Sequence, residues 1–219
     1  MIESIAKNIF VFYSPNLGSN VYILCGKKVA LIDASISTNE RQLKEELSGL
    51  HIMPEDVSMI LFTHAHADHT GCANLFRNAQ KLMHEKDAEA VELGDTNYTL
   101  ASMTGQKAIL RIDKQLSGNE IINIEPFSLK VIHTPGHTKG SVCYYEQRQK
   151  LLFSGDTLLV GSCGRTDLPG GNEKEIVGSI SMLRNIDFNI LLPGHGTILK
   201  ESQKANIDFV LKTLKGKYL

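Results

Sequence analysis

The sequence predicts a layered α/β protein, with two β-sheets packed against each other and helices on the outside. Short apolar runs of strand length occur in two groups along the chain, the second beginning near residue 120. Apolar residues at helical spacing follow the strands of each group. Two such halves within 219 residues predict one domain, residues 1–219, because no linker rich in proline, glycine or serine separates them.

The first half of the chain is expected to form a meander of strands, then a helix and a buried strand. Turns of two to five residues separate the early apolar runs, which is typical of antiparallel strands. Ser37 and Glu40 form a possible capping box for the first helix. Residues 94–118 are polar with only brief apolar runs and have two interpretations, a loop that partly covers a site or a plain surface connection. Strands are expected over 9–13, 20–24, 29–33 and 57–62. Helices are expected over 37–50 and 86–93, and a short helix from about Thr70 is expected to place Leu75 and Phe76 in the core.

The second half repeats the strand pattern and ends in amphipathic helices. Each of these helices has apolar residues at helical spacing, which gives it one face for packing against a sheet. Strands are expected over 121–124, 129–132, 141–145, 151–153 and 190–192, and helices from about residue 173 and over 207–214.

The composition is that of an ordinary globular protein. Hydrophobic residues make up 42% of the chain and charged residues 21%. A formal net charge of −1 predicts no nucleic-acid partner, since nucleic-acid-binding domains usually carry a basic excess. No apolar stretch approaches the roughly 18 residues that cross a bilayer, and the first residues do not resemble a signal peptide. Four cysteines without a Cys-x-x-Cys pair predict reduced thiols. Together with the missing signal peptide and membrane span, they predict a cytoplasmic location and no membrane partner. No oligomeric state is predicted.

Three of the eight histidines and one aspartate lie within the motif His64-Ala65-His66-Ala67-Asp68-His69. Side chains two residues apart on an extended segment point the same way, so His64 and His66 can reach one ion together. Asp68 and His69 come where the chain should enter a helix, and their different direction suits a second ion nearby. The buried strand expected over 57–62 would hold these side chains at a rigid strand end.

Three later motifs share this pattern of buried strand, tight turn and candidate ligand. Glycine beside each candidate lets the backbone turn sharply and come close to a site. Because the pattern recurs, the three motifs predict one common metal centre with the first cluster. The motifs are Thr134-Pro135-Gly136-His137, Ser154-Gly155-Asp156 and Pro193-Gly194-His195.

These motifs, in this order, resemble the metallo-β-lactamase superfamily over nearly the whole chain. The resemblance implies an αββα sandwich of two mixed β-sheets with helices on the outer faces. It implies two divalent metal ions, most simply Zn²⁺, with Fe²⁺ or Mn²⁺ as alternatives. The first ion would be held by His64, His66 and His137, the second by Asp68, His69 and His195, and Asp156 would bridge them. Zinc lactamases carry cysteine or serine in place of Asp156, so β-lactam hydrolysis is not expected.

The segment Gly164-Arg165-Thr166-Asp167 narrows the resemblance to one branch. It is similar to short relatives of glyoxalase II (hydroxyacylglutathione hydrolase) and to persulfide dioxygenases. Long forms of glyoxalase II carry a C-terminal helical extension that supplies much of the glutathione site. This chain continues for 24 residues after His195, so those glutathione-binding residues have no expected counterpart.

The leading hypothesis is hydrolysis of a small thioester by hydroxide held at the metals. Asp68 would accept a proton or orient the water, in addition to binding metal. Arg165 would bind a substrate carboxylate, or instead pair with Asp167. The alternatives are a mononuclear iron persulfide dioxygenase, a lactone hydrolase and a non-catalytic metal-binding protein. The expected partner is therefore a small molecule, the thioester or persulfide of a low-molecular-weight thiol.

Asp33 ends an expected strand and has two interpretations. It could orient a ligand histidine from behind, as carboxylates often do at metal sites. It could equally cap a turn.

Overall fold

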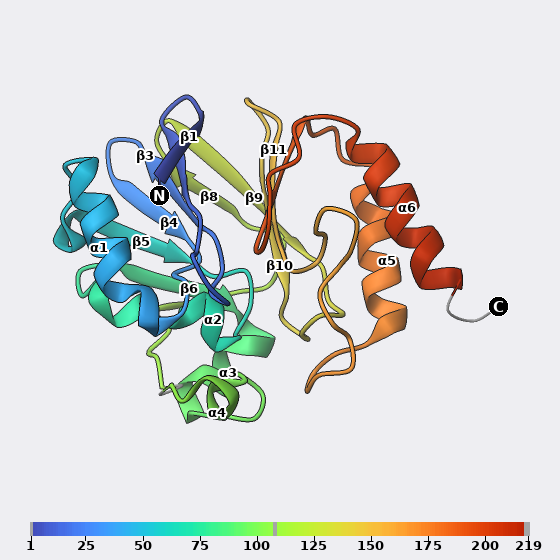
Figure 1. Ribbon diagram of the computed structural model, residues 1–219, viewed down its shortest axis with the longest axis horizontal. Helices are drawn as coiled ribbons and strands as arrows, with labels where there is room; N and C mark the ends of the chain where they lie inside the picture. The colour runs from blue at the N-terminus through green and yellow to red at the C-terminus, as the bar shows by residue number, and fades with distance from the viewer. Residues whose placement is uncertain (1, 107–108, 217–219) are drawn as a thin grey trace.

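Two β-sheets pack face to face in the computed structural model, which describes residues 2–106 and 109–216 (Figure 1). The N-terminal sheet has seven strands in the order β1 to β7. Neighbouring strands are antiparallel from β1 to β4 and parallel from β4 to β7. The strands are β1 (Ile2–Ala6), β2 (Ile9–Phe12), β3 (Val21–Cys25), β4 (Val29–Ile32), β5 (Val57–Leu61), β6 (Gln80–His84) and β7 (Lys114–Leu116).

The C-terminal sheet has five strands in the order β12-β11-β10-β9-β8. Only β11 and β12 pair in parallel, because the chain crosses over through a helix between them. The strands are β8 (Ile121–Ile124), β9 (Phe127–His133), β10 (Val142–Glu146), β11 (Leu151–Gly155) and β12 (Ile190–Pro193).

Helices cover the outer face of each sheet, as Figure 1 shows for α1 on one side and α5 and α6 on the other. The α-helices are α1 (Glu40–Gly49), α2 (Ala67–Thr70), α3 (Glu85–Leu93), α4 (Ala101–Thr104), α5 (Glu173–Leu183) and α6 (Gln203–Gly216). Short 3₁₀ turns are formed by Ser37–Asn39, Pro54–Asp56 and Ala73–Leu75. No helix in the described part of the chain is both long and apolar enough to span a membrane.

Three apolar clusters fill the spaces between these layers. The cluster between the sheets includes Tyr22 and Leu61 from one sheet and Tyr144 and Phe153 from the other. A second cluster joins the N-terminal sheet to α1 and α3, and a third joins the C-terminal sheet to α5 and α6. The order helix, sheet, sheet, helix confirms the αββα sandwich.

Three strands that the sequence did not predict complete the N-terminal sheet. β1 is an edge strand with one buried side chain, Ile5, so it lacks a buried face of strand period. β6 begins with the exposed Gln80 and becomes buried only at its end. β7 is three residues long and lies within 94–118, so the expectation of a plain loop there is wrong. The same segment also contains α4, and residues 107–108 are outside the described part.

Two helix starts also differ from expectation. Ser37 opens a 3₁₀ turn rather than α1, and no side-chain cap forms, so the capping-box prediction is wrong. The backbone N–H of Ser37 instead donates to Gln106 Oε1 at 2.8 Å. A helix is expected to begin near Thr70, but α2 begins at Ala67 and ends at Thr70. Phe76 reaches the core after a separate 3₁₀ turn.

Candidate metal centre

All seven side chains singled out in the sequence come together where strands of both sheets end. Four lie in the loop after β5 and in α2, and one follows each of β9, β11 and β12. They are His64, His66, Asp68, His69, His137, Asp156 and His195.

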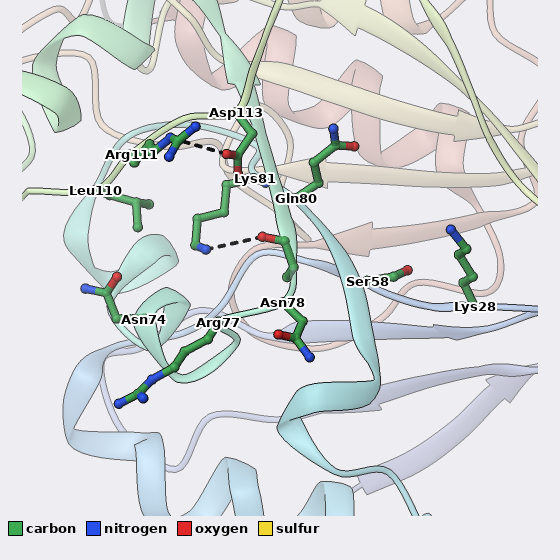
Figure 2. A pocket seen from close by; sticks show the side chains of 11 residues that line it. Lys28, Ser58, Asn74, Arg77, Asn78, Gln80, Lys81, Leu110, Arg111 and Asp113 are labelled. Atoms are coloured by element: carbon green, nitrogen blue, oxygen red, sulfur yellow. Dashed lines mark hydrogen bonds and ion pairs between the residues drawn. The ribbon is translucent and has the colours of Figure 1, made fainter.

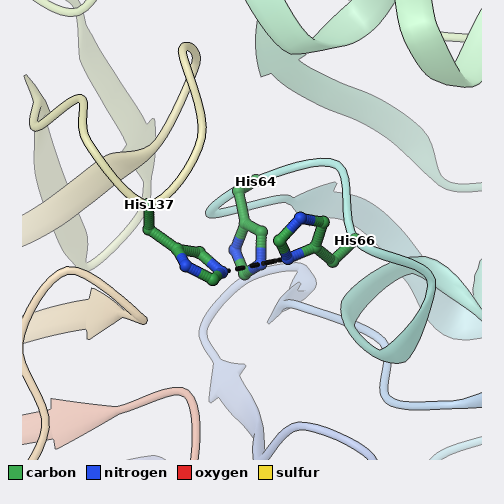
Figure 3. A group of neighbouring side chains, drawn as sticks. All are labelled: His64, His66 and His137. Atoms are coloured by element: carbon green, nitrogen blue, oxygen red, sulfur yellow. Dashed lines mark hydrogen bonds between the residues drawn. The ribbon is translucent and has the colours of Figure 1, made fainter. Parts of the chain in front are cut away.

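Three imidazoles from the two sheets converge on one point (Figure 3). His64 Nε2 lies 3.0 Å from His66 Nδ1, and His137 Nε2 lies 2.9 Å from the same nitrogen. All three side chains are buried. Ligands around a tetrahedral zinc ion, each about 2.0–2.1 Å from it, lie roughly 3.3 Å apart. The three nitrogens are therefore already at about the spacing that one ion requires.

A second group lies beside the first. His69 Nε2 is 3.1 Å from His195 Nε2, which is itself 3.1 Å from Asp68 Oδ2. The distance from His69 Nε2 to Asp68 Oδ2 is 3.8 Å. This group exposes more surface than the first, since the side chain of His195 is 30% exposed. It offers two nitrogens and one oxygen to an ion near solvent.

Asp156 lies between the two groups. Its Oδ2 is 3.6 Å from His137 Nε2 in the first group, and its Oδ1 is 3.4 Å from His69 Nε2 in the second. Oδ1 is buried and has no hydrogen-bond partner among the described residues. A Cβ at Gly194 would collide with that oxygen, so only glycine lets the β12 turn come this close. The carboxylate is placed to face both groups at once.

Hydrogen bonds behind the ligands fix how the rings are turned. Asp33 Oδ2 lies 2.8 Å from His69 Nδ1, and its carboxylate also accepts from the N–H and hydroxyl of Thr63, both at 2.8 Å. Of the two interpretations of Asp33, its contact to His69 favours the orienting one. His137 Nδ1 lies 2.8 Å from the backbone carbonyl of Arg165. Donation through Nδ1 leaves Nε2 of both rings free to bind metal.

Burial favours the neutral form of His64 and His66 in the first group. It lowers the pKa of His64 far below the ordinary value, and the neighbouring His69 and His66 add to the effect. The pKa of His66 falls to about 3, mainly through burial and then through His137. Neutral imidazoles near pH 7 present the lone pairs that metal binding needs.

In the second group, neighbouring carboxylates instead favour the charged form of the histidine His69. Burial acts to lower the pKa of His69, but Asp33 first and then two further carboxylates outweigh it and raise the pKa well above the ordinary value. Burial acts to raise the pKa of Asp156, yet His69 and His195 hold it well below its usual range. A bound cation would compensate this concentration of negative charge in place of the protons on His69 and His195. Together with the imidazole nitrogens, this charge fits divalent metal ions.

The two remaining predicted roles concern Arg165 and Asp68. The Arg165 guanidinium forms two hydrogen bonds to the Asp167 carboxylate, at 3.0 and 2.7 Å, in an exposed position. This pairing matches one of the two alternatives drawn from the sequence, and substrate binding by Arg165 stays a prediction. The Asp68 carboxylate is partly exposed beside His195, and its proton-transfer role likewise stays a prediction.

Sequence reasoning missed the groups that hold the ligand loops from behind, above all Asp87 and Tyr98. Asp87 belongs to α3 and Tyr98 to the segment 94–118, both far from the ligand motifs along the chain. No motif marks either residue, because their role depends on contacts between elements that only the fold brings together.

A separate hollow of about 520 Å³ lies at the opposite ends of β5 and β6, where these strands begin (Figure 2). Its lining is rich in cationic side chains, Lys28, Arg77, Lys81 and Arg111, with Asp113 as its acidic residue. Arg111 Nε lies 3.5 Å from Asp113 Oδ1. None of the histidine and carboxylate groups found in the described residues lies there, so the hollow is distinct from the metal centre.

The fold and the ligand geometry together define a class of protein. The chain belongs to the metallo-beta-lactamase superfamily, whose family model matches residues 15–195. It is a metallo-hydrolase of that superfamily.

Particular relatives are similar over most of the chain. A probable metallo-hydrolase of Methanocaldococcus jannaschii is 35% identical over 191 residues, covering 82% of this chain and 88% of that protein. The hydroxyacylglutathione hydrolase GloC of Haemophilus influenzae is 29% identical over 168 residues, covering 69% of this chain and 75% of that protein.

Solved structures agree in fold. The BLEG-1 B3 metallo-beta-lactamase superposes with a TM-score of 0.75 and 29% identity, covering 91% of this chain and 93% of that one. The di-iron-bound form of TTHA1623 superposes with a TM-score of 0.74 and 27% identity, covering 96% of this chain and all of that one.

Proposed function

We propose that this protein is a binuclear hydrolase that cleaves a small thioester of a low-molecular-weight thiol. The single observation that carries the proposal is the position of Asp156 between two ligand groups, with one oxygen toward each. Similarity to the hydroxyacylglutathione hydrolase GloC supports the thioester class. Zinc is the first choice of metal because the donors are nitrogen and oxygen, and iron is the main alternative.

The reaction needs a nucleophile and a way to move protons. When bound, two divalent ions supply hydroxide near neutral pH and polarise the substrate carbonyl. Asp68 is partly exposed beside His195, and its carboxylate accepts a proton from the attacking water. The acyl carbon gains the water oxygen, the C–S bond breaks, and the thiol leaves with a proton. No serine or cysteine nucleophile is needed.

Arg165 is the proposed contact for a substrate carboxylate. Its guanidinium is exposed and its carbonyl accepts from His137 Nδ1, so its loop is anchored to the first ligand group. A substrate carboxylate would compete with Asp167 for the guanidinium. The proposed partner is thus a small acidic molecule.

Metal analysis paired with substrate assays tests the proposal. Protein purified without added metal should hold about two ions per chain and hydrolyse a hydroxyacyl thioester of glutathione or of a smaller thiol. One iron per chain with oxygen uptake on a persulfide would overturn it in favour of a persulfide dioxygenase. Turnover of a β-lactam or a lactone without thioester cleavage would also contradict it.

A further inference from the structure

Asp87 on α3 carries a fully buried carboxylate with four hydrogen-bond donors around it. Its Oδ1 accepts from the Tyr98 hydroxyl and from the Gly140 N–H, both at 2.7 Å. Its Oδ2 accepts from the Ala65 N–H at 2.9 Å and from the Thr138 hydroxyl at 2.8 Å. Each oxygen therefore takes one backbone amide and one hydroxyl.

These donors belong to the loops that carry the first ligand group. Ala65 lies between His64 and His66, in the loop after β5 of the N-terminal sheet. Thr138 and Gly140 lie within three residues of His137, in the loop between β9 and β10 of the C-terminal sheet. One carboxylate thus joins the two loops that bring these three imidazoles together from different sheets.

The contact is closely packed on both sides. A Cβ at Gly140 would lie 2.6 Å from Asp87 Cγ, so the loop needs glycine to reach the carboxylate. The Tyr98 hydroxyl accepts from the Lys139 N–H at 3.1 Å, which leaves its own proton for Asp87. Burial raises the pKa of Asp87 above its ordinary value, and the four donors offset only part of that rise.

Asp87 has a counterpart behind the second ligand group. The carboxylate of Asp33 contacts His69 Nδ1 directly and also binds Thr63. Among the hydrogen bonds of the described residues, Asp87 makes none to His69, Asp68 or His195, the members of the second group. Asp33 also reaches the first group through the Thr63 hydroxyl, which lies 3.1 Å from His64 Nδ1, whereas the hydrogen bonds of Asp87 go to the loops of the first group alone.

We propose that Asp87 is a positioning residue that sets the metal affinity of the His64, His66 and His137 group and leaves the second group unchanged. The inference rests on the binuclear centre of the proposed function. Asp87 itself binds no ion. It acts by fixing the separation of the two loops beyond the point where the Val142 N–H already joins their bases at the Thr63 carbonyl.

Asp87→Asn is the sharpest variant because it changes the hydrogen bonding and keeps the shape. Its amide oxygen still accepts two donors, while its NH₂ group faces one backbone N–H and one hydroxyl. The hydroxyl can rotate and accept, but the backbone N–H cannot, so one buried amide loses its partner. The loop that carries this amide must then shift.

Competition with a chromophoric zinc chelator measures the affinity of each of the two ions. We expect one ion of Asp87→Asn to bind about ten to a hundred times more weakly, the usual effect of removing a partner behind a ligand. The other ion should bind as in the unmodified protein. Cobalt substitution should show a changed spectrum for the weakened ion alone.

Glu120→Gln is the matched control. The Glu120 carboxylate also accepts four hydrogen bonds, from the Ser117 N–H and hydroxyl and from the N–H groups of Gly118 and Asn119. These donors lie outside the ligand loops. These bonds are more exposed than those of Asp87. We expect both ions of this variant to keep their affinity, which separates the effect of Asp87 from the loss of a carboxylate with four hydrogen bonds elsewhere in the fold.

Three results would overturn the inference: unchanged affinity for both ions in Asp87→Asn, equal weakening of both, or loss of the second group's ion. If Asp87→Asn does not fold, Tyr98→Phe is the variant to measure, because it removes one hydrogen-bond donor to Asp87. It should lower the affinity for the same ion a few-fold, and an unchanged affinity would also overturn the inference. Fewer than two ions in the unmodified protein would instead contradict the proposed function.

Discussion

The two halves of the molecule supply the residues of the candidate metal centre in different ways. The N-terminal half gives four ligands within six residues, from one loop and the short helix α2. The C-terminal half gives three ligands from three separate strand ends, after β9, β11 and β12. The first set is a local feature of the chain, whereas the second exists only when the C-terminal sheet has formed and packed against its neighbour.

Contacts between the sheets connect the two sets. The backbone N–H of Val142 donates to the carbonyl of Thr63 at 2.8 Å, directly before His64. The backbone N–H of Asn20 donates to Gly194 at 2.7 Å, directly before His195. Each half therefore fixes a ligand loop of the other, and the centre depends on the interface as much as on either ligand set.

Asp156→Ala should have the largest effect, because its carboxylate has one oxygen toward each of the two ligand groups. We expect loss of at least one ion per chain and a fall in thioester hydrolysis of about a thousandfold or more, the range for losing metal-supplied nucleophile and charge stabilisation. Elemental analysis and a steady-state assay measure the two effects. Full metal content in this variant would show that Asp156 does not bridge.

His137→Ala and His195→Ala compare the two ligand groups directly. Each variant should lose mainly the ion of its own group, so that both retain about one ion per chain. We expect the ion to be lost more completely from the buried site of His137, because no water reaches it to replace the missing nitrogen. Water does reach the partly exposed site of His195. Titration with zinc checks both; identical losses from the two sites would show that they do not bind independently.

The same contrast explains how much the sequence could predict. The His64 to His69 cluster and the three glycine-flanked motifs are visible as residue patterns, and the structure brings all seven together. The αββα order followed from the apolar runs and the resemblance. Asp87 and Tyr98 could not be predicted, because a polar residue in a helix and a tyrosine in a polar segment carry no sign of the loops they meet.

The missed strands have a similar cause. β1 and β7 border the N-terminal sheet at its two edges, where one side of a strand has no neighbour and few side chains are buried. β6 lies between β5 and β7, but it begins with polar residues at the hollow lined by Lys81. A strand pattern based on apolar alternation therefore fails at edges and at strand ends that face solvent.

Two buried tyrosines offer the finest test of the interface between the halves. The Tyr144 hydroxyl of the C-terminal sheet donates to the carbonyl of Phe62, and the Tyr22 hydroxyl of the N-terminal sheet donates to that of Pro193, both at 2.6 Å. Asn20 Nδ2 also donates to the Pro193 carbonyl, at 3.1 Å, so that oxygen keeps a partner when the Tyr22 hydroxyl is removed.

We therefore expect Tyr144→Phe to lower the free energy of unfolding by about 1–3 kcal/mol and Tyr22→Phe by only about 1 kcal/mol. Urea unfolding of the metal-free variants, with equal m-values, measures the difference. A larger loss in Tyr22→Phe would contradict the role of Asn20. It would show that stability depends more on the hydrogen bond at Pro193, next to the turn that carries His195, than on the one at Phe62, next to the loop that carries His64.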